Sequence, residues 1–207
     1  MIKNTSGELN YISIKEHEEI EKEIYKNSIV LKEDFFTEEE CNILIRFTEE
    51  NKLYNRSKIG DKSGVISDFR TSSSAKAKMN EFDFLIQKID QACEITNNKI
   101  VYLENPQTAR YSVGQKFTLH FDTGGDIFRR HTGVIYLNDD YEGGETYFSE
   151  IDYHVKPKMG RAVFFPSLSD DNLPVYSAHA SLPILKGTKY VFILLFNNSP
   201  IEKLNAI

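Results

Sequence analysis

The sequence predicts an α+β fold in which helices come first and a closed antiparallel β core follows. Two observations support this prediction. Apolar residues recur at helical spacing in two segments before residue 97. From about 99 to 197 the pattern changes to short β-rich runs separated by Gly, Asn, Asp and Pro, which is typical of a sandwich or jelly roll.

The composition limits the classes of protein that this chain can represent. Its 207 residues are enough for one domain with a sizeable core, and 40% hydrophobic and 27% charged residues are ordinary for a globular protein. The net charge of −6 argues against nucleic acid or an anionic membrane as the main partner, since both bind basic surfaces. Neither a signal-type apolar region nor a run of roughly 18 apolar residues is visible, so we expect no membrane span and a cytoplasmic location.

The N-terminal part is expected to be helical and loosely attached. Residues 1–27 begin as a polar lead-in, and residues 15–26 are rich in Glu and Lys, which predicts an exposed helix held by charge pairs or, alternatively, a frayed end. Residues 28–31 form a short apolar run that predicts a strand. Thr37, with a glutamate three positions later, is a capping box and predicts a helix over residues 38–50.

A second helix is expected before the β-rich half. Residues 51–64 are polar and loop-like, residues 65–73 are expected to contain a strand, and residues 80–96 predict an amphipathic helix. Both cysteines fall on apolar helix faces, which predicts buried free thiols rather than a disulfide. The cysteines are Cys41 and Cys93, and the stripe on the second helix is Phe82, Leu85, Ile86, Ile89 and Cys93.

The C-terminal half supplies eight expected strands. Together with the helical part, residues 28–98, the β core of residues 99–197 is expected to form a single domain, residues 28–207, because no linker separates them. The eight runs are Ile100–Leu103, Thr108–Val113, Lys116–Phe121, His131–Leu137, Glu145–Phe148, Arg161–Phe165, Val175–His179 and Thr188–Phe196.

One of these strands ends in a His-x-Asp pair. Residues i and i+2 of a strand point to the same face, so His120 and Asp122 are expected to direct an imidazole and a carboxylate to one point. One further histidine would complete a facial triad, which leaves half of the coordination sphere of Fe(II) open. The pair alone is a weak signal. His17 and His154 lie in polar segments and are expected to be exposed, and the spacing of His131 matches no ligand pattern.

His179 is the candidate third ligand, and a lysine follows it at a useful distance. His179 closes the expected strand 175–179, and the turn after it lets the next strand fold back beside it. Lys189 then opens an otherwise hydrophobic run, residues 190–196. It is either a lysine at a strand edge or a partly buried cation that holds the carboxylate of a small diacid, because a buried ammonium is costly unless an anion meets it.

These residues resemble the signature of the Fe(II)- and 2-oxoglutarate-dependent dioxygenases, and more narrowly the prolyl 4-hydroxylase branch (alpha-subunit catalytic domain). The resemblance covers roughly residues 28–197 and rests on several short segments in combination. Besides His120-x-Asp122, His179 and Lys189, the segments are Tyr111-x-x-Gly114, Tyr136–Asn138, Glu142–Thr146, Gly160–Phe165, His179–Lys189 and Arg70–Ser73.

The resemblance implies a fold and a metal. The fold would be a double-stranded β-helix, a cupin-like jelly roll, with the N-terminal helices packed on it. Fe(II) would be bound by His120, Asp122 and His179. The reaction would use 2-oxoglutarate and O2, would release succinate and CO2, and would require ascorbate as a further cofactor.

The resemblance also implies a site for 2-oxoglutarate. Lys189 would pair with the distal carboxylate, and Tyr111 and Thr146 would add hydrogen bonds to it. Arg129, three residues before Thr132, resembles a catalytic-site arginine near the substrate groove; its other interpretation is an exposed charge.

One position departs from the family pattern. The second tyrosine of the family's run, three residues before the histidine ligand, is Phe117 here, so the substrate need not match that of the collagen-type enzymes. The polar loops at residues 51–64 and 124–126 are candidate lids over the groove.

Three functions therefore compete. The first is hydroxylation of a proline in a peptide or protein, and the second is hydroxylation of a free amino acid or other small molecule. The third, from another class, is a non-catalytic jelly-roll binding module. The sequence leaves the oligomeric state open.

Overall fold

The computed structural model describes residues 2–3, 9–10, 14–59, 64–77, 81–97, 102–122, 129–167 and 175–197. Its elements are three α-helices, two short 3-10 helices and sixteen strands within these ranges. In chain order they are β1 (Ile2–Lys3), β2 (Leu9–Asn10), α1 (Ile14–Ser28), β3 (Val30–Lys32), α2 (Glu38–Glu50), β4 (Asn55–Arg56), β5 (Ser73–Lys76), α3 (Asp83–Ile95), β6 (Tyr102–Leu103), β7 (Gln107–Tyr111), β8 (Phe117–His120), β9 (Arg129–Tyr136), β10 (Glu142–Gly143), β11 (Thr146–Phe148), η1 (Ser149–Ile151), β12 (Tyr153–Val155), β13 (Ala162–Pro166), η2 (Val175–Ser177), β14 (His179–Ser181), β15 (Ile184–Lys186) and β16 (Lys189–Asn197).

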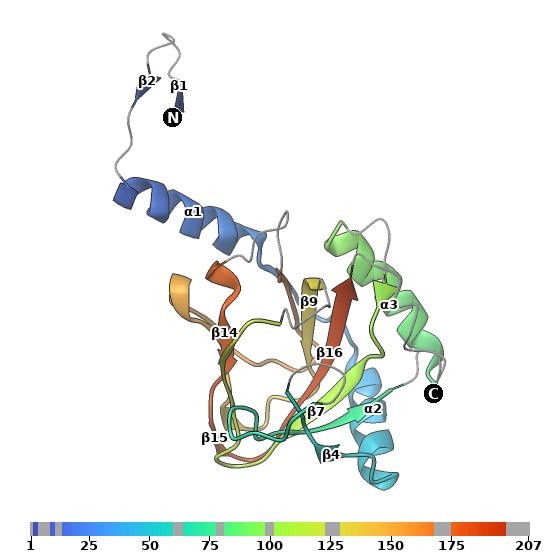
Figure 1. The fold of residues 1–207 in the computed structure, drawn as a ribbon. Coiled ribbons are helices and arrows are strands. Elements are labelled where there is room, and N and C mark those ends of the chain that lie inside the picture. The colour runs from blue at the N-terminus through green and yellow to red at the C-terminus, as the bar shows by residue number, and fades with distance from the viewer. Residues whose placement is uncertain are drawn as a thin grey trace.

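Two antiparallel sheets form the jelly roll (Figure 1). The larger sheet has the order β3-β13-β9-β16-β7-β5-β4, with β6 also paired to β16. The smaller sheet has the order β12-β11-β14-β8. The long strand β16 lies between β9 and β7, so it is the centre of the larger sheet. The predicted α+β fold with a double-stranded β-helix is confirmed.

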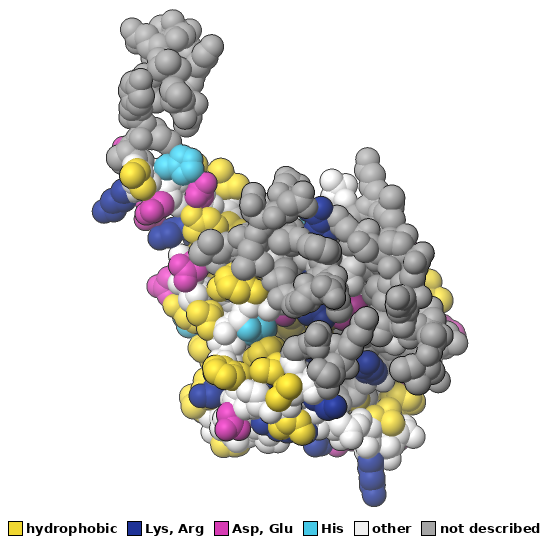
Figure 2. Space-filling view, in the orientation of Figure 1, with side chains coloured by type: hydrophobic (Ala, Val, Ile, Leu, Met, Phe, Trp, Pro, Cys, Tyr) yellow, Lys and Arg dark blue, Asp and Glu magenta, His cyan; other side chains and the backbone are white. Residues whose placement is uncertain are grey.

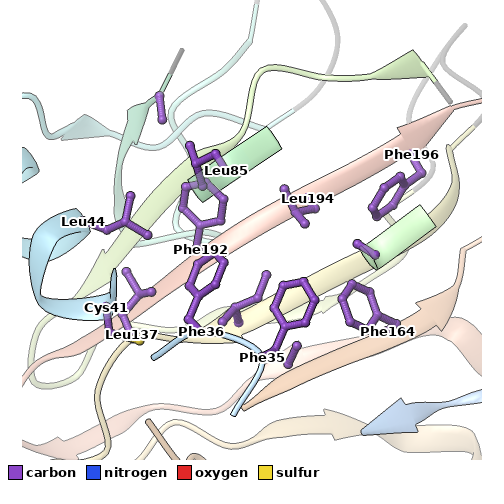
Figure 3. Packing of buried hydrophobic residues seen from close by; sticks show 14 residues of the cluster. Phe35, Phe36, Cys41, Leu44, Leu85, Leu137, Phe164, Phe192, Leu194 and Phe196 are labelled. Atoms are coloured by element: carbon purple, nitrogen blue, oxygen red, sulfur yellow. The ribbon is translucent and has the colours of Figure 1, made fainter. Parts of the chain in front are cut away.

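Strand β16 shows why the core has two halves. Its side chains alternate between the faces of the sheet, as the pleat requires. Phe192, Leu194 and Phe196 face the helices, whereas Val191 and Ile193 face the smaller sheet. Figure 3 shows the helix-side cluster, in which the rings of Phe35, Phe36 and Phe164 pack beside this strand.

Helices α2 and α3 cover the outer face of the larger sheet. Thr37 caps α2 with both hydrogen bonds of the predicted capping box, and the helix buries Cys41 and Leu44. On α3 the buried residues are Leu85 and Ala92, while the cysteine of that helix is half-buried. The placement of Ile86 on the buried stripe is wrong, since this side chain is 58% exposed. It lies one position after Leu85, and one helical step rotates it away from the sheet.

Both thiols are free, as expected. Burial raises the pKa of Cys41 to about 12, and burial also raises the pKa of Cys93. Neither side chain is therefore a ready nucleophile. No helix in the described ranges has the length and apolar character needed to span a membrane.

Three predicted segments differ from the structure. The expected loop 51–64 contains β4, which pairs with β5, and the strand expected within residues 65–73 begins only at Ser73. In the run 175–179, Val175–Ser177 form a 3-10 turn, so His179 opens a strand instead of closing one. Strands β10, β12 and β15 were not predicted, because two or three residues carry too little alternation to be recognised.

Candidate active site

Three candidate metal ligands meet on the smaller sheet. His120 ends β8 and His179 opens β14, and the two residues are direct partners across the antiparallel pair. Asp122 follows two positions after His120. Its Oδ1 lies 3.4 Å from Nε2 of His120, and its Oδ2 lies 3.7 Å from Nε2 of His179. The three ligand atoms lie within 4.8 Å of one another, so a single ion could bind all three.

The backbone fixes which nitrogen each histidine presents. Nδ1 of His120 lies 2.8 Å from the carbonyl oxygen of Thr118, and Nδ1 of His179 lies 3.0 Å from that of Ser177. A proton on each Nδ1 satisfies these carbonyls and leaves the Nε2 lone pairs directed at the carboxylate, as in a metal centre. Burial, followed by the nearby His120, lowers the pKa of His179 to about 4, so this ring is neutral at neutral pH.

Asp122 is held by Thr132 as well as by the histidines. Burial alone would raise its pKa, but the charges and hydrogen bonds of its neighbours hold the pKa well below its usual range. The Thr132 hydroxyl donates to Oδ2 over 2.7 Å and lies 2.8 Å from the Ser167 hydroxyl. The hydroxyls of Thr132 and Ser167 thus fix the orientation of the Asp122 carboxylate.

Removing the Thr132 hydroxyl is expected to weaken metal binding. Thr132→Val keeps the shape of the side chain but loses the hydrogen bond to Asp122, and loss of such an outer contact typically costs about 10- to 100-fold in metal affinity. Titration of the metal-free protein with Fe(II) under anaerobic conditions measures the effect. Thr132→Ser is the matched control and should bind like the wild type. Equal affinities for the valine and serine variants would contradict this role.

Arg129 lies beside the ligands in a half-buried ion pair. Its guanidinium donates two hydrogen bonds to Glu104, over 2.6 and 2.9 Å, and a third to the backbone oxygen of Asp122. Burial would lower the pKa of Arg129, but the Glu104 carboxylate raises it. The side chain is therefore a fixed cation that lines the cavity and braces the segment carrying Asp122.

A cavity of about 450 Å³ extends from the ligands between the two sheets. At its inner end, the Lys189 ammonium donates to the oxygen of Gly144 over 2.6 Å and to the Ser181 hydroxyl over 2.8 Å. Within the described ranges no carboxylate forms an ion pair with it, and burial lowers its pKa to about 7. Gly144 has φ of +70°, and a Cβ there would lie 2.4 Å from Ile184 Cδ1, which explains a glycine at this wall.

Tyr111 and Thr146 lie at the same end of the cavity. Tyr111 is the ladder partner of Lys189, whose ammonium lies 5.3 Å from the tyrosine ring centre. The Thr146 hydroxyl lies 2.7 Å from that of Tyr136. The contact of Ser181 with Lys189 was not predicted from the sequence, because it forms between β14 of the smaller sheet and β16 of the larger sheet.

Phe117 stacks on the first histidine ligand. The two rings are 3.5 Å apart with an interplanar angle of 11°, and the Arg70 guanidinium lies 5.0 Å from the Phe117 ring. Arg70 comes from a segment that hydrogen-bonds along the edge of β8, where Thr118 N donates to Phe69 O over 2.8 Å. The phenyl ring thus supports the imidazole of His120 directly.

The entrance is largely apolar. Ile59, Phe69 and Leu119 line the cavity, and the last two are 64% and 53% exposed. Of the candidate lids, the first contributes Lys58 and Ile59 to the lining, whereas residues 124–126 lie outside the described residues.

The remaining histidines take no part in the triad. His17 and His154 are exposed, as expected. Burial, followed by the charge of Arg130, lowers the pKa of the half-buried His131 to about 4, and His131 does not line the cavity.

Comparisons with known proteins agree with this geometry. The family described as the 2OG-Fe(II) oxygenase superfamily matches residues 106–197. A probable prolyl 4-hydroxylase 10 of Arabidopsis thaliana is 28% identical over 186 residues, which covers 76% of this chain and 64% of the relative. Prolyl 4-hydroxylase subunit alpha-1 of Gallus gallus is 32% identical over 135 residues, covering 59% of this chain and 26% of the relative. This chain therefore spans less than two thirds of the length of either relative.

A solved structure is similar over most of the chain. It is the viral collagen prolyl hydroxylase of Paramecium bursaria Chlorella virus-1, crystallised as a 2OG complex. It superposes with a TM-score of 0.68 at 26% identity and covers 83% of this chain and 97% of its own.

Proposed function

We propose that the protein hydroxylates a proline within a peptide or protein segment, since its residues 106–197 match the family described as the 2OG-Fe(II) oxygenase superfamily. One observation carries the proposal: the His-Asp-His cluster and a buried lysine that forms no ion pair with any carboxylate of the described residues line the same cavity. The first fits Fe(II), and the second fits a diacid co-substrate.

His120, Asp122 and His179 would hold the metal. The fit rests on the donor set, because two neutral imidazoles and one carboxylate suit a facial Fe(II) site and each imidazole already has its second nitrogen hydrogen-bonded. Bound Fe(II), together with 2-oxoglutarate and O2, supplies the oxidation that hydroxylates a C–H bond and releases succinate and CO2. Ascorbate is proposed as the accompanying reductant.

Lys189 would hold the distal carboxylate of 2-oxoglutarate. Its ammonium is buried beside Gly144 and Ser181 and forms no ion pair with a carboxylate of the described residues. A bound anion would therefore supply the opposite charge. The Tyr111 and Thr146 hydroxyls would complete this pocket by hydrogen bonding. The protein's own contribution is therefore to orient the co-substrate and to exclude water around it.

The cavity entrance supports an extended substrate. Ile59, Phe69 and Leu119 offer apolar contact where the cavity opens, and Arg129 lies close to the ligands behind them. A proline-containing segment is apolar and preorganised, which suits such a groove. The names of the relatives point the same way.

A second candidate is hydroxylation of a free amino acid or other small acid. Lys58 and Arg70 line the cavity, and no described carboxylate forms an ion pair with either of them, so a substrate carboxylate could bind there. Assays with peptides and with free amino acids in parallel separate the two candidates.

Succinate release tests the proposal. Purified protein with Fe(II), ascorbate and 2-oxoglutarate should release succinate above a His179→Ala control, and a proline-rich peptide should increase the rate and gain 16 mass units. Faster turnover of free L-amino acids would favour the second candidate. No succinate above the control, across peptides and amino acids, would favour a non-catalytic binding module.

A further inference from the structure

Helix α1 places one side chain, Tyr25, behind the candidate metal ligands. Most of this helix is exposed and projects from the body of the protein (Figures 1 and 2), and its Ile14 and Ile24 are 81% and 65% exposed. Tyr25 is 6% exposed and is the buried residue of the helix. Because one side chain of α1 is buried and the rest of the helix is largely exposed, α1 contacts the β core mainly through Tyr25.

The Tyr25 side chain bridges two segments of the β core. Its hydroxyl donates to the carbonyl oxygen of Pro166 over 3.1 Å, and the Ser177 side chain hydrogen-bonds to it. Its ring lies 5.9 Å from that of Tyr176, whose hydroxyl donates back to Glu21 on α1 over 3.1 Å. The end of α1 is thus tied to the end of β13 and to the 3-10 turn η2.

Each of these segments orients a different metal ligand. In η2, the carbonyl oxygen of Ser177 accepts from Nδ1 of His179. Next to Pro166, the Ser167 hydroxyl contacts Thr132, which donates to the Asp122 carboxylate. Burial raises the pKa of the Tyr25 hydroxyl, and the negative charge of Asp122 raises it further. The two groups therefore lie within electrostatic reach of each other.

We propose that Tyr25 is a positioning residue of the metal centre, through which docking of α1 sets the orientation of His179 and Asp122. The inference rests on the proposed function, because it takes the His-Asp-His cluster as an Fe(II) site. Loss of the Tyr25 hydroxyl should free both segments to shift and should weaken the metal site more than it weakens the fold. If Tyr25 only packed against the β core, loss of its hydroxyl would lower the stability of the fold and leave metal binding nearly unchanged.

The test compares Tyr25→Phe with Tyr54→Phe. Tyr54 is a matched control, because its half-buried hydroxyl accepts a hydrogen bond from Thr48 over 2.9 Å and does not line the cavity. Anaerobic titration gives the Fe(II) dissociation constant of each variant, the visible absorption of the protein with Fe(II) and 2-oxoglutarate reports ligand geometry, and thermal unfolding gives Tm. Tyr25→Phe should weaken Fe(II) binding about tenfold and alter the absorption, while Tyr54→Phe should lower only Tm.

Two results would overturn the inference, and they are distinguishable. If the wild type binds Fe(II) and Tyr25→Phe binds it equally well with the same absorption, Tyr25 does not position the ligands, although the metal site stands. If the wild type itself binds no Fe(II), the metal site and the proposed function fail together.

Discussion

Asp122→Asn is expected to abolish Fe(II)-dependent turnover and to weaken Fe(II) binding more than about a hundredfold, beyond the loss typical of an outer contact. The substitution keeps the size of the side chain but removes the one negative charge among the three candidate ligands. Both histidines direct their Nε2 atoms at this carboxylate, over 3.4 and 3.7 Å. The amide N–H group of asparagine could donate a hydrogen bond to these Nε2 lone pairs, which would then compete with the metal for them. Anaerobic Fe(II) titration and succinate release measure the two effects.

Asp152→Asn is the matched control for this change. Asp152 is exposed and has φ of +47°, a left-handed conformation that asparagine adopts readily, so this variant should fold and bind Fe(II) like the wild type. Unchanged Fe(II) affinity in Asp122→Asn would show that the metal, if bound, is held elsewhere.

Lys189→Met should raise the 2-oxoglutarate concentration needed for half-maximal turnover about 10- to 150-fold, as expected for loss of a hydrogen bond to a charged group. Methionine fills the space of the aliphatic chain but removes the cation that faces the cavity. Fe(II) affinity without 2-oxoglutarate should stay near the wild-type value, since Lys189 contacts Gly144 and Ser181 and none of the ligands. Lys186→Met is the control, because Lys186 lies nearby on β15 with its side chain 76% exposed.

The pH dependence provides an independent check on Lys189. Burial lowers its pKa to about 7 in the protein without co-substrate, so the ammonium loses its proton as pH rises through this value. A bound carboxylate favours the charged form, and binding above pH 7 must therefore take up a proton. The wild-type affinity for 2-oxoglutarate should fall as pH rises above about 7, whereas that of Lys189→Met should not change in this range. A collapse of Fe(II) affinity in Lys189→Met would refute the assigned role.

The architecture could be predicted from the sequence because two periodic helical segments are followed by a succession of short β-rich runs. The capping box at Thr37 and the apolar stripe around Leu85 predicted α2 and α3, and the β-rich half predicted the jelly roll. The error at residues 175–179 has a clear cause. Whether His179 ends or begins a strand depends on its partner across the sheet, His120, and the local pattern contains no information about that partner.

The candidate site was predictable only in part, for the same reason. His120 and Asp122 were suggested by the His-x-Asp spacing and Lys189 by its place at the start of an apolar run, and the family resemblance joined them with His179 into one predicted site. The supporting contacts could not be predicted, because the hydrogen bond of Thr132 and the contacts of Tyr25 join elements far apart in the chain.

The pairing of β8 with β14 has a consequence for folding kinetics. The two histidines are neighbours in space but lie far apart in the chain, and β16 must insert between β7 and β9 to complete the larger sheet. Such non-local pairing is slow, since the entropy of closing long loops is lost before the contacts that compensate for it can form. Metal capture during refolding should therefore not precede the pairing of β8 with β14, and a nascent chain still lacking β14 cannot assemble the three ligands.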